Sequence, residues 1–329
     1  MYKGEILKKY LIYILAVSSL LFFNTCEENF SPKDELLEAY ILNSIIRVND
    51  DFQFASIHKT FDVQGFNPES DSLNPFVDGA DITLTYRGEE YKFKDTVLTP
   101  LHEQRFDGPL KYYYLKNFKP IRDQEDIIIK AVLPDGKILK AAARVPILFE
   151  IDRGQSDQII PSDFHPDFIS VHWFPRSKVY FQYYKFRLRI KYEIHSDNES
   201  VINYVEVPIK KSNASEDNSI YPSLTKQIST SYPLELFEET MKKIGDDITD
   251  KKNIFITNKA EFEIVALDPN LAAYYFAGVT QNIYSVRFDQ TLFSNVEGGF
   301  GIVGAMMERK FTISISDSFI RRFGYSVKN

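Results

Sequence analysis

The sequence is poor in cysteine and tryptophan, with one residue of each among 329. A single cysteine excludes a disulfide within the chain and any zinc site built on several thiolates. Long basic runs are also missing, and the formal net charge is −7. Because binding to phosphate backbones depends on clustered Lys and Arg, we expect no nucleic acid partner.

The familiar signatures of catalysis are missing as well. The chain has no G-x-S-x-G, P-loop or H-E-x-x-H sequence. Its histidines do not pair at metal-ligand spacing on one predicted element; they are His58, His102, His165, His172 and His195. His165 lies near Asp167, but in a proline-broken segment that favours a solvated loop over a catalytic pair. We therefore expect no catalytic residue, no cofactor, no metal and no enzymatic activity.

Four glycines lie close together near the C-terminus: Gly298, Gly299, Gly301 and Gly304. Three of them match G-x-G-x-x-G, the dinucleotide fingerprint, which should end a strand and begin a helix. Here the strand-like residues 309–316 follow instead, which argues against a nucleotide. We interpret the four as a structural glycine loop that supplies positive φ or room for close backbone approach.

Aromatic residues, in contrast, are abundant, with 27 Phe and 20 Tyr. Because aromatic side chains favour strands, the composition predicts a mainly β protein. Two interpretations of this abundance stay open: a surface that stacks on glycans or peptides, and a β-sandwich core, which we favour. For Trp173, burial is likewise favoured over a role as a sugar platform.

The N-terminus has the pattern of an export signal. Residues 1–9 are basic, and residues 10–23 are apolar and uncharged. A membrane-spanning helix needs roughly 20 such residues, so this run has the length of a secretory signal instead. Cys26 follows it almost directly.

A cysteine in this position resembles the lipobox of bacterial lipoproteins. The resemblance implies a diacylglyceryl group on Cys26, a signal peptide over residues 1–25 and an acylated tether over residues 26–36. Thr25 departs from the family, which prefers Gly, Ala or Ser there, and a plain signal peptide with an incidental cysteine is the alternative. The acidic residues after Cys26, at Glu27 and Glu28, resemble the surface-export signal of Bacteroidetes-type lipoproteins. We therefore expect a lipid anchor in the outer membrane, with the protein facing outward.

Residues 37–147 read as short strands separated by turn residues, which is typical of a sandwich. Pro134, Asp135 and Gly136 predict a hairpin between two of these strands. We expect an Ig-like β-sandwich here. The strand-like segments are 37–48, 52–61, 80–86, 111–118, 126–133 and 137–145.

Residues 148–329 predict a second domain, β-rich α+β with two or three short helices at 233–245, 268–278 and 317–324. Asp268 has the position of an N-cap. In residues 184–195, apolar and charged residues alternate strictly, which predicts a strand with one cationic face. That face is interpreted as solvated, and an anionic ligand or partner is the alternative.

Three stretches together resemble an uncharacterised Bacteroidetes-type outer-membrane lipoprotein family, a domain of unknown function often encoded beside TonB-dependent receptors. They are Cys26 with its two glutamates, residues 133–146 and residues 293–305. The resemblance implies a binding or accessory protein, with the membrane and a TonB-dependent receptor as partners. The alternatives are an envelope hydrolase or glycan-processing enzyme with its site at the domain junction, and a structural adhesin-like module.

Overall fold

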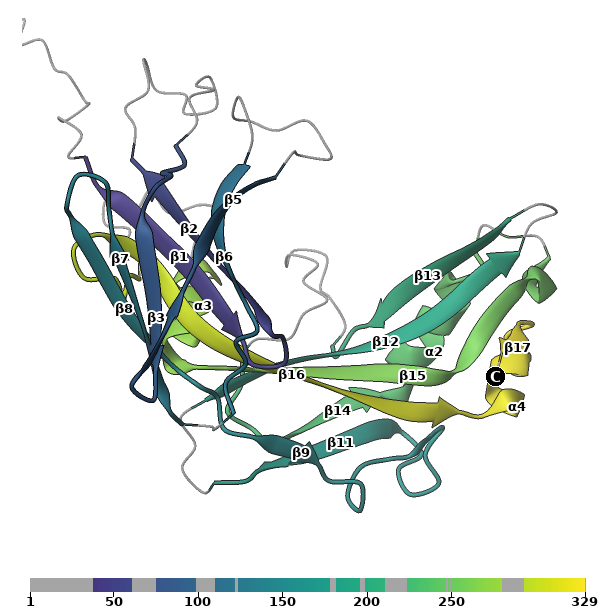
Figure 1. Ribbon diagram of the computed structural model, residues 1–329. Coiled ribbons are helices and arrows are strands. Elements are labelled where there is room, and N and C mark those ends of the chain that lie inside the picture. The colour runs from purple at the N-terminus through teal and green to yellow at the C-terminus, as the bar shows by residue number, and fades with distance from the viewer. Residues whose placement is uncertain are drawn as a thin grey trace, which may run out of the picture. The chain divides into compact units, whose positions relative to one another are not determined.

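The computed structural model (Figure 1) describes residues 38–60, 75–98, 110–121, 124–177, 182–195, 199–210, 224–246, 248, 250–279 and 293–328. Cys26, its flanking residues and His102 lie outside these ranges. The described part is mainly β, as the composition predicts, and it contains three sheets and three short α-helices. Glu38–Asn329 groups as one compact unit.

The first eight strands pair into two antiparallel groups. One group has the order β1-β2-β6-β5, and the other is a separate sheet with the order β4-β3-β7-β8. Alternate residues of both groups enter one hydrophobic core, for example Leu42, Ile57 and Ile129. The strands are β1 (Tyr40–Arg47), β2 (Phe52–Lys59), β3 (Asp81–Tyr86), β4 (Glu89–Lys92), β5 (Lys94–Leu98), β6 (Leu110–Lys116), β7 (Asp126–Val132) and β8 (Ile138–Arg144).

The hairpin expected at Pro134–Gly136 joins β7 to β8. The Leu133 amide donates to the Lys137 carbonyl at 2.8 Å, and Gly136 has a φ of 85°. Glycine reaches this left-handed conformation without the strain that a side chain imposes. The prediction is therefore confirmed together with its cause.

The remaining strands extend the first group into a ten-stranded sheet with the main order β13-β12-β15-β16-β1-β2-β6-β5, and form a three-stranded sheet β14-β11-β9. They are β9 (Phe149–Ile151), β10 (Ile159–Ile160), β11 (Phe168–Pro175), β12 (Tyr183–His195), β13 (Ser200–Val207), β14 (Ser229–Pro233), β15 (Ile254–Leu267), β16 (Phe300–Ile315) and β17 (Ser326–Lys328). The helices are α2 (Leu234–Lys243), α3 (Pro269–Val279) and α4 (Asp317–Arg322), close to their predicted positions.

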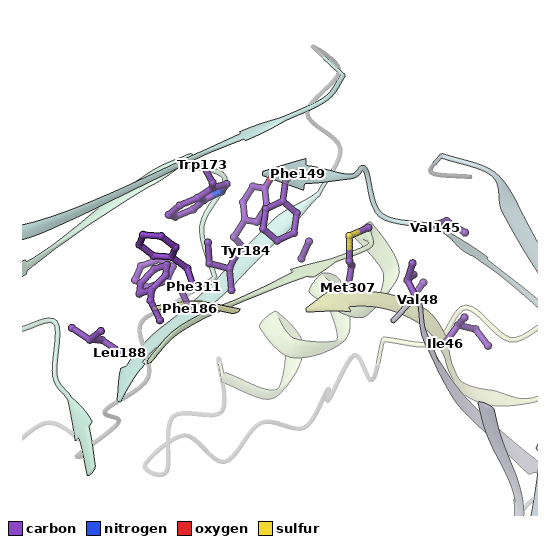
Figure 2. Packing of buried hydrophobic residues seen from close by; sticks show 14 of the residues in the cluster. Ile46, Val48, Val145, Phe149, Trp173, Tyr184, Phe186, Leu188, Met307 and Phe311 are labelled. Atoms are coloured by element: carbon purple, nitrogen blue, oxygen red, sulfur yellow. The ribbon is translucent and has the colours of Figure 1, made fainter. Parts of the chain in front are cut away.

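The large sheet crosses the boundary expected at residues 147–148. β1 pairs in parallel with β16, from Ile41 opposite Phe300 to Arg47 opposite Met306. The core is continuous across the same place. Figure 2 shows Met307 with Phe149 and Tyr184 on one side and Ile46 and Val48 on the other. All five side chains belong to one buried cluster.

The glycine stretch leads into β16 where three backbones meet: Gly298 and Gly299 precede the strand, and Gly301 and Gly304 lie within it. An added Cβ would lie 2.2 Å from the Ile138 carbonyl oxygen at Gly298, 2.5 Å from the Tyr40 oxygen at Gly299 and 2.0 Å from the Leu42 oxygen at Gly301. Gly298 and Gly301 also have positive φ, at 80° and 119°. The glycines thus let β16 lie against β1 and β8.

Candidate binding site on the open sheet face

The outward face of β2 and β6 carries a row of aromatic side chains. Phe52 and Phe54 alternate with the buried residues Gln53 and Ala55, and Phe54 lies opposite Tyr114 of β6. We call the four rings Phe52, Phe54, Tyr112 and Tyr114 the aromatic row. The Phe52 and Tyr114 rings stack with centroids 5.6 Å apart, and those of Phe54 and Tyr112 lie 5.4 Å apart.

Three of these rings line a hollow of about 690 Å³, named here the aromatic hollow. Its other lining residues include Asn43, Ile45, Arg47, Ser56 and Tyr274. Phe54 is 45% exposed and Tyr274 48% exposed. Outward-facing strand positions are usually polar, so this face presents an unusual amount of aromatic surface to solvent.

A second hollow of about 300 Å³, the charged hollow, lies on the same sheet. It is lined by Arg47, Lys185, Phe186, Arg187, Glu263, Val265, Leu267, Tyr275, Met306 and Glu308. Strand register explains this set, because Lys185 lies opposite Val265, Val265 opposite Glu308, and Met306 opposite Arg47. Arg47 lines both hollows, so the two are neighbours.

Helix α3 borders both hollows with consecutive tyrosines, Tyr274 at the aromatic hollow and Tyr275 at the charged one. Its position depends on Gly304, where an added Cβ would lie only 2.8 Å from the Leu271 Cβ. Asp268 begins the helix as predicted, with Oδ1 accepting from the Leu271 amide at 2.9 Å. Oδ2 accepts from the Arg144 amide at 3.2 Å.

The acids of the charged hollow are held by basic side chains. Glu263 is 2.8 Å from Arg187 Nη2 and 3.2 Å from Arg189 Nη2, and Glu308 is 3.1 Å from Lys310 Nζ. Lys185 Nζ lies 5.4 Å from the Tyr275 ring centroid. Burial, and secondarily the charge of Arg187, lower the pKa of Lys185.

The cationic face predicted for residues 184–195 is therefore an ion-paired face. Arg187 and Arg189 are only partly exposed, at 29% and 17%, and contact the acids of β13 and β15. The faces predicted from the strict alternation are also wrong at the C-terminal end of β12. A register shift between Ile190 and Tyr192 changes the faces, so Glu193 is 4% exposed instead of solvated.

The proline-broken segment around His165 contains a carboxylate–imidazole pair. His165 Nδ1 lies 3.1 Å from both carboxylate oxygens of Asp157, not of Asp167. Asp157 also accepts from the hydroxyl of Ser162 and, at 2.6 Å, from the Ser170 amide. The Ser162 hydroxyl donates to the carboxylate rather than to the imidazole, so the three residues do not form a serine–histidine–aspartate relay.

Other expectations concern single side chains. Trp173 is 1% exposed and packs against Tyr184 at 5.4 Å, which confirms burial over a sugar platform. His58 is edge-on to Phe76 at 4.5 Å, and burial lowers the pKa of its imidazole. Among the described residues, no group of three or more His, Cys, Asp or Glu could hold a metal ion. In that same portion, no helix combines the length and apolarity required to cross a membrane.

Comparison with known proteins gives little. Neither a scan of protein-family models nor a search of curated proteins found a match. Among solved structures, the chain is similar to the mouse nectin-like molecule 4 full ectodomain (Ig1–Ig3), with 6% identity and a TM-score of 0.19, over 84% of this chain and 64% of that one. The architecture and the site therefore rest on the strands and side chains described above.

The sequence did not identify the aromatic row as a site. In "FQFASIHK" both alternating sets contain apolar residues, and β6 begins with three consecutive tyrosines. Neither pattern says which side chains point to solvent. The one available signal was the overall excess of aromatics, for which a stacking surface was the less favoured interpretation.

Proposed function

We propose that this chain is a lipid-anchored, outward-facing binding or accessory protein of a bacterial outer membrane, without enzymatic activity, that serves a TonB-dependent transport system. The observation that carries the binding role is the pair of adjoining hollows on one sheet face. Exposed aromatic surface bordered by polar groups is typical of interaction sites. The anchor and the transport partner are supported only by the sequence around Cys26 and the family resemblance.

Metabolic labelling with an alkyne fatty acid tests the anchor. We expect the wild-type protein to carry the label and to be found in the outer-membrane fraction. The Cys26→Ser variant should remain unlabelled. Equal labelling of both proteins, or none of the wild type, would contradict lipidation at Cys26. Thr25→Gly, which restores the preferred lipobox residue, should increase the labelled fraction.

Affinity purification from detergent-solubilised envelopes tests the partner. We expect a TonB-dependent receptor to be recovered with the wild-type protein and to be reduced in a control eluate from cells that lack the tagged chain. Recovery of no outer-membrane receptor would contradict the accessory role and leave the lipid anchor intact.

We also infer that residues 37–147 are an Ig-like sandwich. Strand order supports this, because β1-β2-β6-β5 and β4-β3-β7-β8 correspond to the ABED and C′CFG sheets of an Ig domain. An experimental structure with β1 paired to β8 in place of β2 would contradict the inference.

The second candidate is an envelope hydrolase that uses the Asp157–His165 pair. The carboxylate orients the imidazole through Nδ1, as in many general bases. Hydrolysis of p-nitrophenyl acetate or p-nitrophenyl glycosides that is lost in His165→Gln and retained in His195→Gln would support it. Turnover unaffected by His165→Gln would exclude this site.

A further inference from the structure

We propose that strand β13 (Ser200–Val207) is a dimerisation edge, along which two copies of this chain pair antiparallel about a two-fold axis at Asn203. The ten-stranded sheet would then continue from one protomer into its partner. This inference goes beyond the binding role proposed above. It requires neither the hollows, the lipid anchor nor the transport partner.

The outer edge of β13 offers backbone groups to another strand. β13 lies at one end of the large sheet and pairs there with β12 (Figure 1). In the part of the chain that the structure describes, the backbone groups that residues 201–205 direct away from β12 have no hydrogen-bond partner. A row of such donors and acceptors matches the backbone of an extended strand.

The side chains of β13 are apolar and exposed on both faces of the sheet. Successive residues of a strand point to opposite faces. Ile202 and Tyr204 share one face and are 53% and 52% exposed, and Val201 on the other face is 51% exposed. Val207, 2% exposed, marks the end at which the strand enters the core. A second strand along this edge would remove apolar surface from water on both faces.

The other sheet edges of the described chain are protected from such pairing. β5, at the far end of the large sheet, has five residues and begins with Lys94 and Asp95, and β4 has four residues, three of them charged. β8 is covered through a bridge between Lys140 and Glu297, and β14 ends in Pro233. β9, β10 and β17 have three residues or fewer. β13 has eight residues, a single charged one, no proline and an unbroken register with β12, so the usual protections of an edge are missing there.

The sequence of β13 is complementary to itself, which makes a second copy the fitting partner. In antiparallel pairing about Asn203, Ile202 lies opposite the partner's Tyr204 on one face. On the other face, Val201 lies opposite the partner's Val205. The two Asn203 side chains meet at the axis, where each amide can donate to the other. The same patch thus serves both protomers, as a two-fold interface requires.

The ends of this register are compatible as well. Glu206 lies opposite the partner's Ser200, so no like charges meet, and it keeps its own ion pair with Arg187 at 3.2 Å. An axis at Tyr204 would instead place Ile202 opposite the partner's Glu206. The register about Asn203 is therefore the one that matches apolar with apolar and polar with polar residues.

Sedimentation velocity across a concentration series tests the dimer. The protein is the chain from residue 27 onward, which keeps the compact unit Glu38–Asn329 and contains no cysteine. We expect a monomer–dimer equilibrium that Ile202→Lys weakens by about tenfold or more, because each ammonium group would face an apolar pair. Val97→Lys, at a position 56% exposed on the opposite edge of the same sheet, is the matched control and should leave the equilibrium unchanged.

A pair of opposite charges tests the axis. Asn203→Asp and Asn203→Lys each place two like charges opposite one another, so each variant alone should be monomeric. An equimolar mixture of the two places opposite charges together and should recover the dimer. A partner strand from a different protein would not produce this recovery.

Cysteine cross-linking tests the register without adding a charge, so it applies even if a charged variant fails to fold. Asn203→Cys places two thiols directly opposite, with Cα atoms about 5 Å apart, which a disulfide can span. Copper(II)–phenanthroline should therefore link them, as it takes one electron from each thiol and the two protons are released. Ser200→Cys, about 20 Å from its copy in this register, should remain unlinked.

Several results would overturn this dimer. They are a monomer at every concentration, a dimer that Val97→Lys weakens as much as Ile202→Lys does, a charge-variant mixture that stays monomeric, and equal cross-linking at positions 200 and 203. A dimer broken by Phe54→Lys and unaffected by Ile202→Lys would assign the contact to the aromatic row instead.

Discussion

At the scale of single residues, Asp268 combines two requirements that conflict. Its carboxylate accepts hydrogen bonds from the Leu271 and Arg144 amides, which favour the charged form. Burial opposes them and is the larger effect, so the pKa of Asp268 rises to about 6. The residue that starts α3 and joins it to β8 is therefore also a pH-dependent element of stability.

The sign of this dependence follows from the shift. In the folded protein Asp268 keeps its proton over a range, from about pH 4 to about 6, in which the unfolded chain has lost it. The contribution to stability is therefore complete below about pH 4 and is lost as the pH rises through about 6, with a total of about 3 kcal/mol. Asp268→Asn cannot ionise.

Between pH 4 and 7 the wild type loses stability and Asp268→Asn does not, so we expect the stability of the variant relative to wild type to rise by about 3 kcal/mol. At acid pH the variant is the less stable protein, because its amide loses one backbone contact. Urea unfolding across this range measures it. Asp250→Asn, which alters a cap at the surface, is the control. A constant difference between Asp268→Asn and wild type would contradict a buried, titrating carboxylate.

At the scale of elements, the junction of β16 with β1 depends on glycine. Gly301 and Gly136 both have positive φ, at 119° and 85°. Only Gly301 faces a carbonyl oxygen 2.0 Å from an added Cβ, because nothing lies within 4 Å at Gly136. Gly301→Ala should therefore cost about 4 kcal/mol or more, and Gly136→Ala about 1 kcal/mol from backbone strain alone. Thermal unfolding compares them, and equal costs would contradict the close approach.

The ion pairs across β12, β15 and β16 allow a second test at this scale. Glu263 is 8% exposed and contacts Arg187, Arg189 and Lys310. Replacing it with Gln removes the most buried acid of this group, although each cation keeps one other acid, and should cost about 2 kcal/mol. Glu308→Gln removes a contact that is 36% exposed and should cost less than about 1 kcal/mol. Similar urea midpoints for the two variants would contradict this difference.

Local elements were predictable, and their pairing was not. The α2 and α3 helices and the β7–β8 hairpin were found from capping residues, periodicity and turn chemistry. β4 and β5 were not predicted because the sequence from Glu89 to Leu98 is rich in charged residues, and its alternation is confined to the short run of residues 91–94. The neighbours of Arg187 were missed for another reason: Glu263 is distant in sequence, and only sheet register brings the two together. The same limitation hid both hollows.

At the scale of the whole molecule, one buried cluster connects the expected sandwich with the C-terminal strands. We expect the unit Glu38–Asn329 to unfold in one transition, with calorimetric and van't Hoff enthalpies that agree. Phe149→Ala, which removes a fully buried ring beside Tyr184, should cost about 3–5 kcal/mol.

This destabilisation should raise hydrogen exchange in β7 and in β12 together. Mass spectrometry of peptides from both strands measures it. Two resolved thermal transitions, or faster exchange confined to β12, would indicate instead that the parts on either side of residue 147 unfold independently.

The pairing of β1 with β16 also limits when the fold can form during synthesis of the chain. The Asn43 side chain accepts a hydrogen bond from the Ile302 amide, 259 positions later in the chain. Until the ribosome has added the residues of β16, strand β1 has a neighbour on one side only, and such distant contacts form slowly. The large sheet can therefore close at its first strand only after residue 302 has been made.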